Sequence, residues 1–103
     1  MTDRLTDKVA LITGSDSGIG QATAIEFAKE GADLVVTYLE DAKGAAETER
    51  RVQETGRRAM VRQLDISDET SVEACFDAAI AEFGTVDILM NNASVDASGT
   101  NVA

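Results

Sequence analysis

The chain has 103 residues, of which 44% are hydrophobic and 27% are charged, a balance typical of one globular domain. Its 19 acidic residues outnumber its 9 basic ones, and the resulting net charge of −10 disfavours nucleic acid and anionic lipid as partners. With one cysteine and no histidine, the chain can form no internal disulfide, no zinc site built on His/Cys clusters and no histidine-based catalytic triad.

The first half of the chain reads as two strands, each followed by a helix. Residues 8–13 are continuously apolar at their centre, as in a strand covered on both faces. Residues 18–30 form a helical pattern, 34–38 a second strand, and 41–55 a helix with so few apolar positions that it is expected to lie loosely on the sheet. The positions expected to face the sheet are Ala22, Ile25 and Ala28 in the first helix, and Ala42, Ala45, Ala46 and Val52 in the second, with Gly31 and Gly56 as the stops.

The second half continues the same alternation. Residues 58–64 alternate apolar with polar side chains, which predicts a strand near a sheet edge. Ser67 is expected to cap a third helix that Gly84 closes, residues 86–90 form a fourth strand, and residues 94–103 are a polar tail without periodicity. The apolar stripe of the third helix consists of Val72, Cys75, Phe76, Ala79, Ile80 and Phe83.

Strands that alternate with helices through short joints predict an α/β fold with a parallel sheet and helices on both faces. We expect one domain over residues 1–93, followed by the tail. No apolar run is long enough to span a membrane, and the N-terminus lacks the apolar core of a signal peptide. These features predict a cytoplasmic protein without a membrane partner.

The joint between the first strand and the first helix, residues 13–20, is rich in glycine. Backbone amides and the helix dipole converge at such a joint on a point suited to a phosphate group. Gly14 allows a sharp exit from the strand, Gly18 leaves room for a pyrophosphate to touch the backbone, and Gly20 lets the helix pack close to the sheet. No lysine follows the last glycine, so this is not a Walker loop. The alternative is a tight turn whose glycines serve packing only.

This segment resembles the T-G-x-x-x-G-x-G fingerprint of the short-chain dehydrogenase/reductase family. Residues 64–66, Leu-Asp-Ile, resemble the part of that family that holds the adenine amino group with an aspartate. Residues 91–94, Asn-Asn-Ala-Ser, resemble its Asn-Asn-Ala-Gly motif, which lines the adenosine side and steadies the sheet. The resemblance spans residues 6–94 and implies part of a Rossmann-type, doubly wound sheet with strand order 3-2-1-4.

The resemblance also implies a dinucleotide site, because ligands of open parallel sheets gather outside the carboxyl ends of the strands. Gly14, Asp65 and Asn91 should converge there. Two alternatives stay open: Asp65 could cap the third helix together with Ser67, and Asn91 with Asn92 could form only a turn. The implied cofactor-binding residues are Gly14, Ser15, Asp16, Ser17, Gly18, Ile19, Gly20, Tyr38, Asp65, Ile66, Asn91 and Ala93, and no metal site is expected.

The chain departs from the family pattern in two respects. Ser94 stands where the family motif ends in glycine. The family's catalytic Tyr-x-x-x-Lys is missing as well, because the only tyrosine, Tyr38, is followed at the fourth position by Ala42, and Lys43 misses the spacing by one. We therefore expect no catalytic residue in this chain and no turnover by the chain alone, although its complete relatives transfer hydride between a nicotinamide and an alcohol or carbonyl.

The choice between NAD and NADP is only weakly indicated. Tyr38 and Leu39 occupy the places where NAD-preferring members put an acid and NADP-preferring members a base. Asp16, Glu40 and Asp41 make the neighbourhood acidic and unfavourable for a 2′-phosphate, which favours NAD slightly.

The alternative function is that of a non-catalytic, nucleotide-binding or self-associating Rossmann module. The fourth strand is expected to have an open edge and an uncovered face that exposes Val86, Ile88 and Met90 or their neighbours. Such a surface predicts a homo-oligomer or association through the sheet edge.

Overall fold

The computed structural model describes residues 4–92, 94–95 and 101–102. The main sheet has four parallel strands in the order β3-β2-β1-β4, as the sequence predicts. The strands are β1 (Val9–Ile12), β2 (Asp33–Tyr38), β3 (Ala59–Gln63) and β4 (Ile88–Met90), and the helices that join them are α1 (Gly18–Lys29), α2 (Ala42–Glu54) and α3 (Glu69–Phe83).

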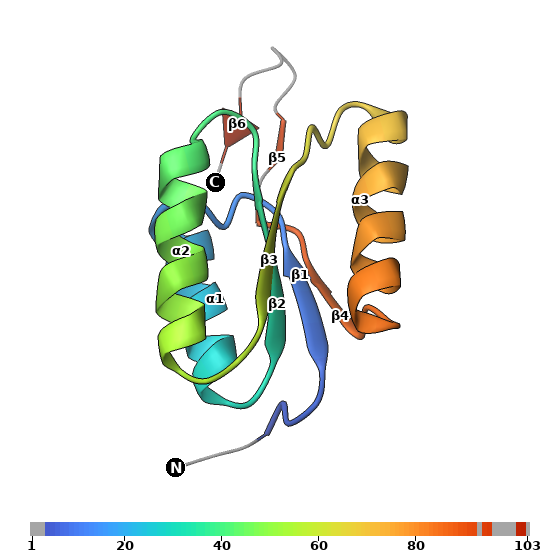
Figure 1. Ribbon diagram of the computed structural model, residues 1–103. Coiled ribbons are helices and arrows are strands. Elements are labelled where there is room, and N and C mark those ends of the chain that lie inside the picture. Colours follow the sequence, from blue (N-terminus) through green and yellow to red (C-terminus); the bar gives the residue numbers. More distant parts are fainter. Residues whose placement is uncertain (1–3, 93, 96–100, 103) are drawn as a thin grey trace.

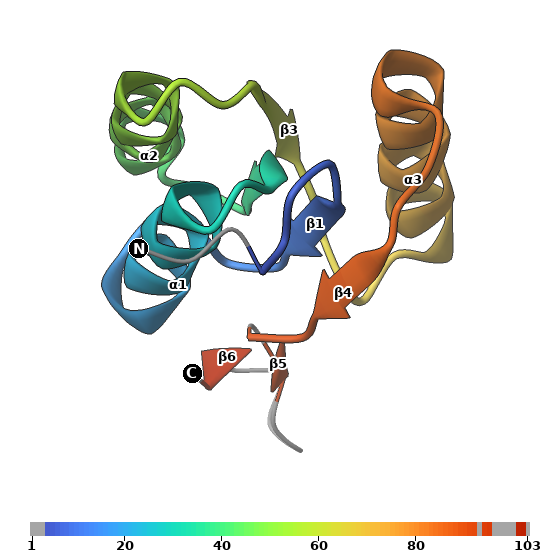
Figure 2. The same ribbon diagram turned by 90° about the horizontal axis from the view of Figure 1, so that it is seen from below.

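The sheet lies between two helical layers, with α1 and α2 on one face and α3 on the other (Figures 1 and 2). Alternate residues of β1 therefore point into two cores. Ala10 and Ile12 belong to the core beneath α1 and α2, whereas Val9 and Leu11 belong to the core beneath α3. This arrangement explains the continuous apolar run of β1 and confirms the Rossmann-type α/β fold.

The buried faces of α1 and α2 agree with the predicted ones at Ala28, Ala45 and Val52 and differ at other positions. In α1 the buried side is Gly20, Ala24 and Ala28, at a spacing of four, and the predicted core position Ala22 is exposed. The prediction failed because small residues let the helix approach closely, and a pattern based on hydrophobicity does not weigh glycine. In α2 the buried residues are Ala45, Thr48 and Val52, whereas Ala42 and Ala46 are exposed.

The start of α3 also corrects the sequence analysis. Asp68, not Ser67, is the N-cap: its carboxylate accepts hydrogen bonds from the backbone N–H groups of Thr70 (3.0 Å) and Ser71 (3.4 Å). Ser67 instead donates to Asp65. Asp and Ser are both good caps, so local preference could not choose between adjacent residues. Gly84 ends the helix in the left-handed conformation, as predicted.

The amino-terminal end of the sheet is held by ion pairs around Asp33, which is buried at the start of β2. Its carboxylate lies 3.1 Å from the Arg57 guanidinium and 3.4 Å from that of Arg58, and it also accepts the backbone N–H of Arg58. The Arg58 guanidinium stacks over the ring of Phe83, 4.7 Å from its centroid. These contacts join β2, the segment that leads into β3, and the end of α3.

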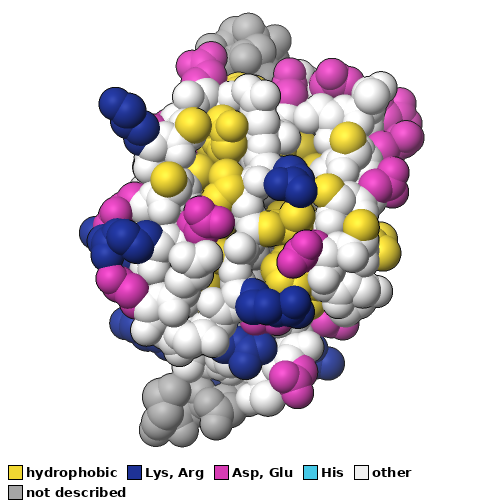
Figure 3. Space-filling model, in the orientation of Figure 1, with side chains coloured by type: hydrophobic (Ala, Val, Ile, Leu, Met, Phe, Trp, Pro, Cys, Tyr) yellow, Lys and Arg dark blue, Asp and Glu magenta, His cyan; other side chains and the backbone are white. Residues whose placement is uncertain are grey.

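The two edges of the sheet are β3, as predicted, and β4. At the β4 edge Leu89 is 52% exposed and Ile88 and Met90 are half-buried, and Ile80 on α3 is 50% exposed. Figure 3 shows hydrophobic side chains at the surface between α2 and α3, on the side of β3, and acidic side chains along α3. None of the helices in the described parts of the chain is long and apolar enough to cross a membrane.

The described residues of the predicted polar tail form paired strands. Two short strands, β5 (Ser94–Val95) and β6 (Asn101–Val102), pair antiparallel with each other in a separate two-stranded sheet. Strands of two residues carry no periodic pattern, so the sequence could not predict this pairing.

Candidate functional site

The turn that follows β1 contains unpaired backbone amides, and those of Gly18 and Ile19 belong to exposed residues. Gly14 and Gly18 have φ angles of 64° and 56°, a conformation that glycine adopts without strain. Ser17 is the N-cap of α1, but its side chain makes no capping hydrogen bond. Among the described residues, the backbone N–H groups of Gly18, Ile19 and Gly20 have no acceptor. The amino end of α1 is thus available to an anion, and Ile19, 70% exposed, lies beside it.

The base of this turn is tied to β2 by buried hydroxyl groups. Thr37 donates its side-chain hydroxyl to the Ile12 carbonyl (2.9 Å) and accepts the backbone N–H of Gly14 (3.1 Å). Ser15 and Thr37 bond reciprocally: the N–H of Ser15 donates to the Thr37 carbonyl, and the N–H of Thr37 donates to Ser15 Oγ, both at 3.0 Å. Ser15 is fully buried, so its side chain supports the turn from inside.

A second support comes from the segment after β4. Asn92 Nδ2 donates to the Gly14 carbonyl (3.2 Å), and the Asn92 N–H donates to Thr13 Oγ1 (2.9 Å). A Cβ at Gly20 would lie 2.3 Å from the Gly14 carbonyl oxygen and 2.7 Å from Asn92 Nδ2. Gly20 is therefore needed for close packing, as expected, and the close partners are this carbonyl and this amide.

Asp16 lies half-buried in the turn, and its pKa is raised above the ordinary value for an aspartate. Burial is the main cause, and the negative charge of Asp41 adds to it, while a hydrogen bond from the backbone of Asp16 itself acts in the opposite direction. Asp41 caps α2 by accepting the backbone N–H of Gly44 (2.8 Å). Two acidic side chains thus interact where the turn meets the start of α2.

Asp65 follows β3, at the carboxyl end of the parallel strands, and the turn after β1 lies at the same end. Its carboxylate accepts from the N–H (2.9 Å) and the hydroxyl (2.6 Å) of Ser67, and these bonds lower the pKa of Asp65. Asp65 therefore shapes the turn before α3, while Asp68 caps the helix. We call the turn after β1, residues 13–20, the glycine turn. Among the described residues no hydrogen bond joins Asp65 to the glycine turn, and β2 lies between β3 and β1, the strands that precede Asp65 and the turn.

The remaining candidate residues are placed as follows. Tyr38, at the end of β2, is half-buried against the core beneath α1 and α2, and Ile66 packs against the core beneath α3. Asn91 is exposed just after β4. Ala93 lies outside the described residues. The structure thus brings Gly14, Gly20 and Asn92 together, whereas Asp65 and Ile66 follow β3, which β2 separates from β1.

Sequence reasoning missed several residues that hold the turn. Thr37 and Thr48 are fully buried hydroxyls, and Gln21 bonds to Thr48. The sequence analysis places Asn92 in the Asn-Asn-Ala-Ser motif or in a turn and predicts no contact for its side chain, whereas in the structure Asn92 contacts Gly14. The one available signal was a threonine at the end of an otherwise apolar strand, because a buried hydroxyl needs a partner there.

A parallel sheet with open amides at the first strand–helix joint defines a Rossmann-type α/β protein. The family model described as short chain dehydrogenase matches residues 8–103, and the chain belongs to this family.

Individual relatives agree with this assignment. The uncharacterized oxidoreductase YhdF of Bacillus subtilis is 45% identical over 91 residues, which are 88% of this chain and 32% of the relative, so the chain spans about a third of it. The short-chain dehydrogenase/reductase homolog YusS of the same organism is 42% identical over 86% of this chain and 82% of its own length. The solved structure of a 7α-hydroxysteroid dehydrogenase with NADH and 7-oxo glycochenodeoxycholic acid is 41% identical, with a TM-score of 0.85 over 90% of this chain and 36% of that one.

Proposed function

We propose that this chain forms the dinucleotide-binding part of an NAD(P)-dependent oxidoreductase that transfers hydride between the cofactor and an alcohol or carbonyl compound. The observation that carries the proposal is the set of unpaired amides at the amino end of α1, of which those of Gly18 and Ile19 belong to exposed residues and that of Gly20 to a buried one. A Cβ at Gly18 would meet no atom within 4 Å, so this backbone is open to a ligand. The residues present therefore fit a pyrophosphate.

In this proposal the turn from Gly14 to Gly20 holds the two phosphates, with Ser17 and Ile19 beside them. Asp65 and Ile66 contact the adenine, Tyr38 forms a wall near it, and Asn91 with Ala93 contacts the adenosine ribose. When bound, the nicotinamide would supply the hydride chemistry. No residue of this chain is given a catalytic role, and the chain alone is expected to show no turnover.

The acidic surroundings of the turn favour NAD over NADP. Burial is the main cause of the raised pKa of Asp16, the charge of Asp41 adds to it, and exposed Glu40 is a third acidic residue nearby in sequence. A 2′-phosphate placed at the end of β2 would add further like charge. We expect the dissociation constant for NADPH to exceed that for NADH.

Isothermal titration of the chain with NADH and NADPH tests the proposal. Gly18→Ala adds a methyl group and the strain of a positive φ at the first of the open amides, and Gly56→Ala is a matched control, because both glycines have positive φ and open space. A hydrogen bond to a charged group is worth roughly 1.5–3 kcal/mol, so Gly18→Ala should weaken NADH binding by about tenfold or more. Gly56→Ala should leave it unchanged. A wild-type chain that binds neither dinucleotide would contradict the proposal.

The exposed apolar residues at the β4 edge favour a second candidate function, a self-associating module without catalysis. Leu89 at this edge and Ile80 on α3 are each about half exposed, and among the described residues β4 has one strand neighbour. Sedimentation velocity at micromolar concentrations distinguishes the two outcomes, because a self-associating chain sediments as a dimer or larger species. A stable monomer would argue against this second function and leave dinucleotide binding untouched.

A further inference from the structure

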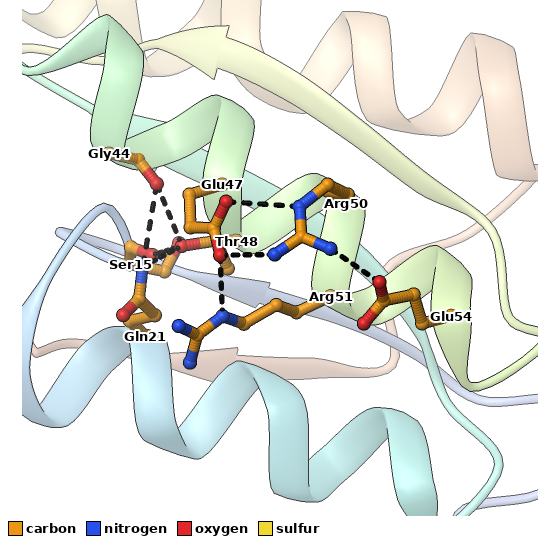
Figure 4. Close-up of polar contacts among 8 residues, drawn as sticks. All are labelled: Ser15, Gln21, Gly44, Glu47, Thr48, Arg50, Arg51 and Glu54. Atoms are coloured by element: carbon orange, nitrogen blue, oxygen red, sulfur yellow. Dashed lines mark hydrogen bonds and ion pairs between the residues drawn. The ribbon is translucent and has the colours of Figure 1, made fainter.

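Helix α2 is fastened to the glycine turn by a buried hydroxyl. Thr48 Oγ1 donates to the backbone carbonyl of Ser15 (2.8 Å) and accepts a hydrogen bond from Gln21 Nε2 on α1 (2.8 Å). Figure 4 shows these groups converging between the turn and the two helices. Thr48 is fully buried, so water cannot replace either bond.

The contact is specific to this position of the helix. A threonine within a helix often bonds only to the carbonyl four residues before it, and Thr48 Oγ1 lies 3.1 Å from that carbonyl, of Gly44. Its distance to the Ser15 carbonyl is shorter, and the Gln21 bond fixes the hydroxyl from the other side. Thr48 thus links three segments, the turn, α1 and α2.

Backbone packing at the start of α2 supports the same link. A Cβ at Gly44 would lie 2.3 Å from the carbonyl oxygen of Asp16, so the first turn of α2 touches the backbone of the glycine turn directly. Two consecutive carbonyls, those of Ser15 and Asp16, therefore contact α2. Because a peptide unit is planar, holding a carbonyl also fixes the direction of the N–H that follows it.

We propose that Thr48 and Gln21 are positioning residues that hold the glycine turn in the shape needed to bind the phosphates of a dinucleotide. This inference rests on the proposed function, since it concerns the ligand of the same turn. Neither residue touches the ligand. Their effect passes through the carbonyls of Ser15 and Asp16, whose peptide units carry the N–H groups of Asp16 and Ser17, to the backbone that leads into Gly18.

The test compares a substitution in the middle of α2 with one at the carboxyl end of this helix. Thr48→Val removes the hydroxyl at nearly constant shape, and Thr48→Ser keeps it. Thr55→Val is the matched control, because the Thr55 hydroxyl also bonds a backbone carbonyl, that of Val52 (2.7 Å), at the end of α2 remote from the turn. Each chain is titrated with NADH and with adenosine, and amide hydrogen exchange is followed over residues 16–20.

Loss of one hydrogen bond of ordinary strength corresponds to roughly a fivefold change in an equilibrium constant. Thr48→Val should weaken NADH binding by about that factor, change adenosine binding by less than about twofold, and speed exchange over residues 16–20. Thr48→Ser should behave as wild type. General destabilisation would instead affect both ligands alike and would appear in Thr55→Val too. If Thr48→Val does not fold, Gln21→Met removes the donor from the same network and should show the same pattern.

Two results would overturn the inference: NADH binding and loop exchange that are unchanged in Thr48→Val, or equal changes in Thr48→Val and Thr55→Val. If the wild-type chain fails to bind NADH, the proposed function fails. In that case hydrogen exchange still decides whether Thr48 holds the turn, because it needs no ligand.

Discussion

The side-chain amide of Asn92 donates to the carbonyl of Gly14 across 3.2 Å, joining the segments that leave two neighbouring parallel strands. Asn92 comes two residues after β4, and Gly14 comes two residues after β1. The shape of the first turn thus depends on a residue 78 positions further along the chain. Local sequence alone cannot establish such a contact.

Asn92→Ala should destabilise the chain by about 1 kcal/mol, because the partly buried Gly14 carbonyl loses its donor. The neighbouring change Asn91→Ala is the control, since the Asn91 side chain is exposed. Urea denaturation without ligand measures both. Equal free energies of unfolding for the two variants would show that the Asn92 bond adds nothing to stability.

Gly20→Ala should destabilise the chain, although glycine-to-alanine changes inside helices ordinarily stabilise by about 1 kcal/mol. The new methyl group would lie 2.3 Å from the Gly14 carbonyl oxygen, and overpacking of this kind costs roughly 1–3 kcal/mol. The same reversal is expected for Gly44→Ala against the carbonyl of Asp16. Thermal unfolding shows whether each variant is less or more stable than the wild type. A higher melting temperature for either variant would show that its new methyl group does not clash with the carbonyl oxygen.

Asp16→Asn should improve NADPH binding more than NADH binding, because it removes one negative charge near the expected 2′-phosphate. The pKa of Asp16 is raised, so this side chain takes up its proton at a higher pH than an ordinary aspartate. As the pH falls towards that pKa, the wild-type ratio of NADPH to NADH dissociation constants should shrink towards the ratio of the variant. Titrations at several pH values check this, and parallel pH profiles for the two chains would exclude Asp16 as the cause.

Leu89→Lys should reduce any self-association, because it places a charge on the half-exposed apolar side chain at the β4 edge. Ile19→Lys is the matched control, since Ile19 is exposed as well but lies at the start of α1, in the layer on the other side of the sheet from α3. Sedimentation coefficients over a range of concentrations provide the comparison. If both substitutions act equally, net charge and not the β4 edge governs association.

Glu47→Gln should make the free energy of unfolding of the chain depend less on pH between pH 7 and pH 2. Hydrogen bonds from Arg50 (2.6 and 3.0 Å) and Arg51 (2.7 Å) lower the pKa of Glu47 from 4.5 to about 2, and Arg50 also pairs with Glu54 (Figure 4). A carboxylate with a depressed pKa adds stability above pH 4.5, and that contribution disappears as the pH falls through about 2.

The difference in unfolding free energy between wild type and Glu47→Gln should therefore be small but measurable at pH 7 and vanish near pH 2. Glu82→Gln controls for the loss of one charge, because Glu82 is exposed and makes no ion pair among the described residues. If this difference in unfolding free energy is the same at pH 2 as at pH 7, Arg50 and Arg51 do not stabilise the chain through the Glu47 carboxylate.

The order of the elements and the strand order could be predicted because each depends on local signals or on a recognisable family. Gly31, Gly56 and Gly84 all take positive φ after a helix, as their positions indicate. The continuous apolar run of β1 also has the two-sided burial that it predicts. These features need no knowledge of distant contacts.

The supports of the glycine turn could not be predicted in the same way. Thr37, Thr48 and Asn92 are polar residues that matter through partners 22 to 79 positions away. A hydrophobic pattern leaves such residues out, and caps such as Ser67 and Asp68 are too similar for local preference to decide between them. What the sequence missed is therefore the polar contacts that cross between elements.

The ion pairs around Asp33 lie at the opposite end of the parallel strands from the glycine turn, and they fasten the start of β2 to Arg57 and Arg58. The contacts that align the strands and the turn proposed to bind the ligand thus lie at opposite ends of the sheet. Redesign of the turn or of the start of α2 to accept a different nucleotide could proceed without loosening the anchor that keeps β3 in register.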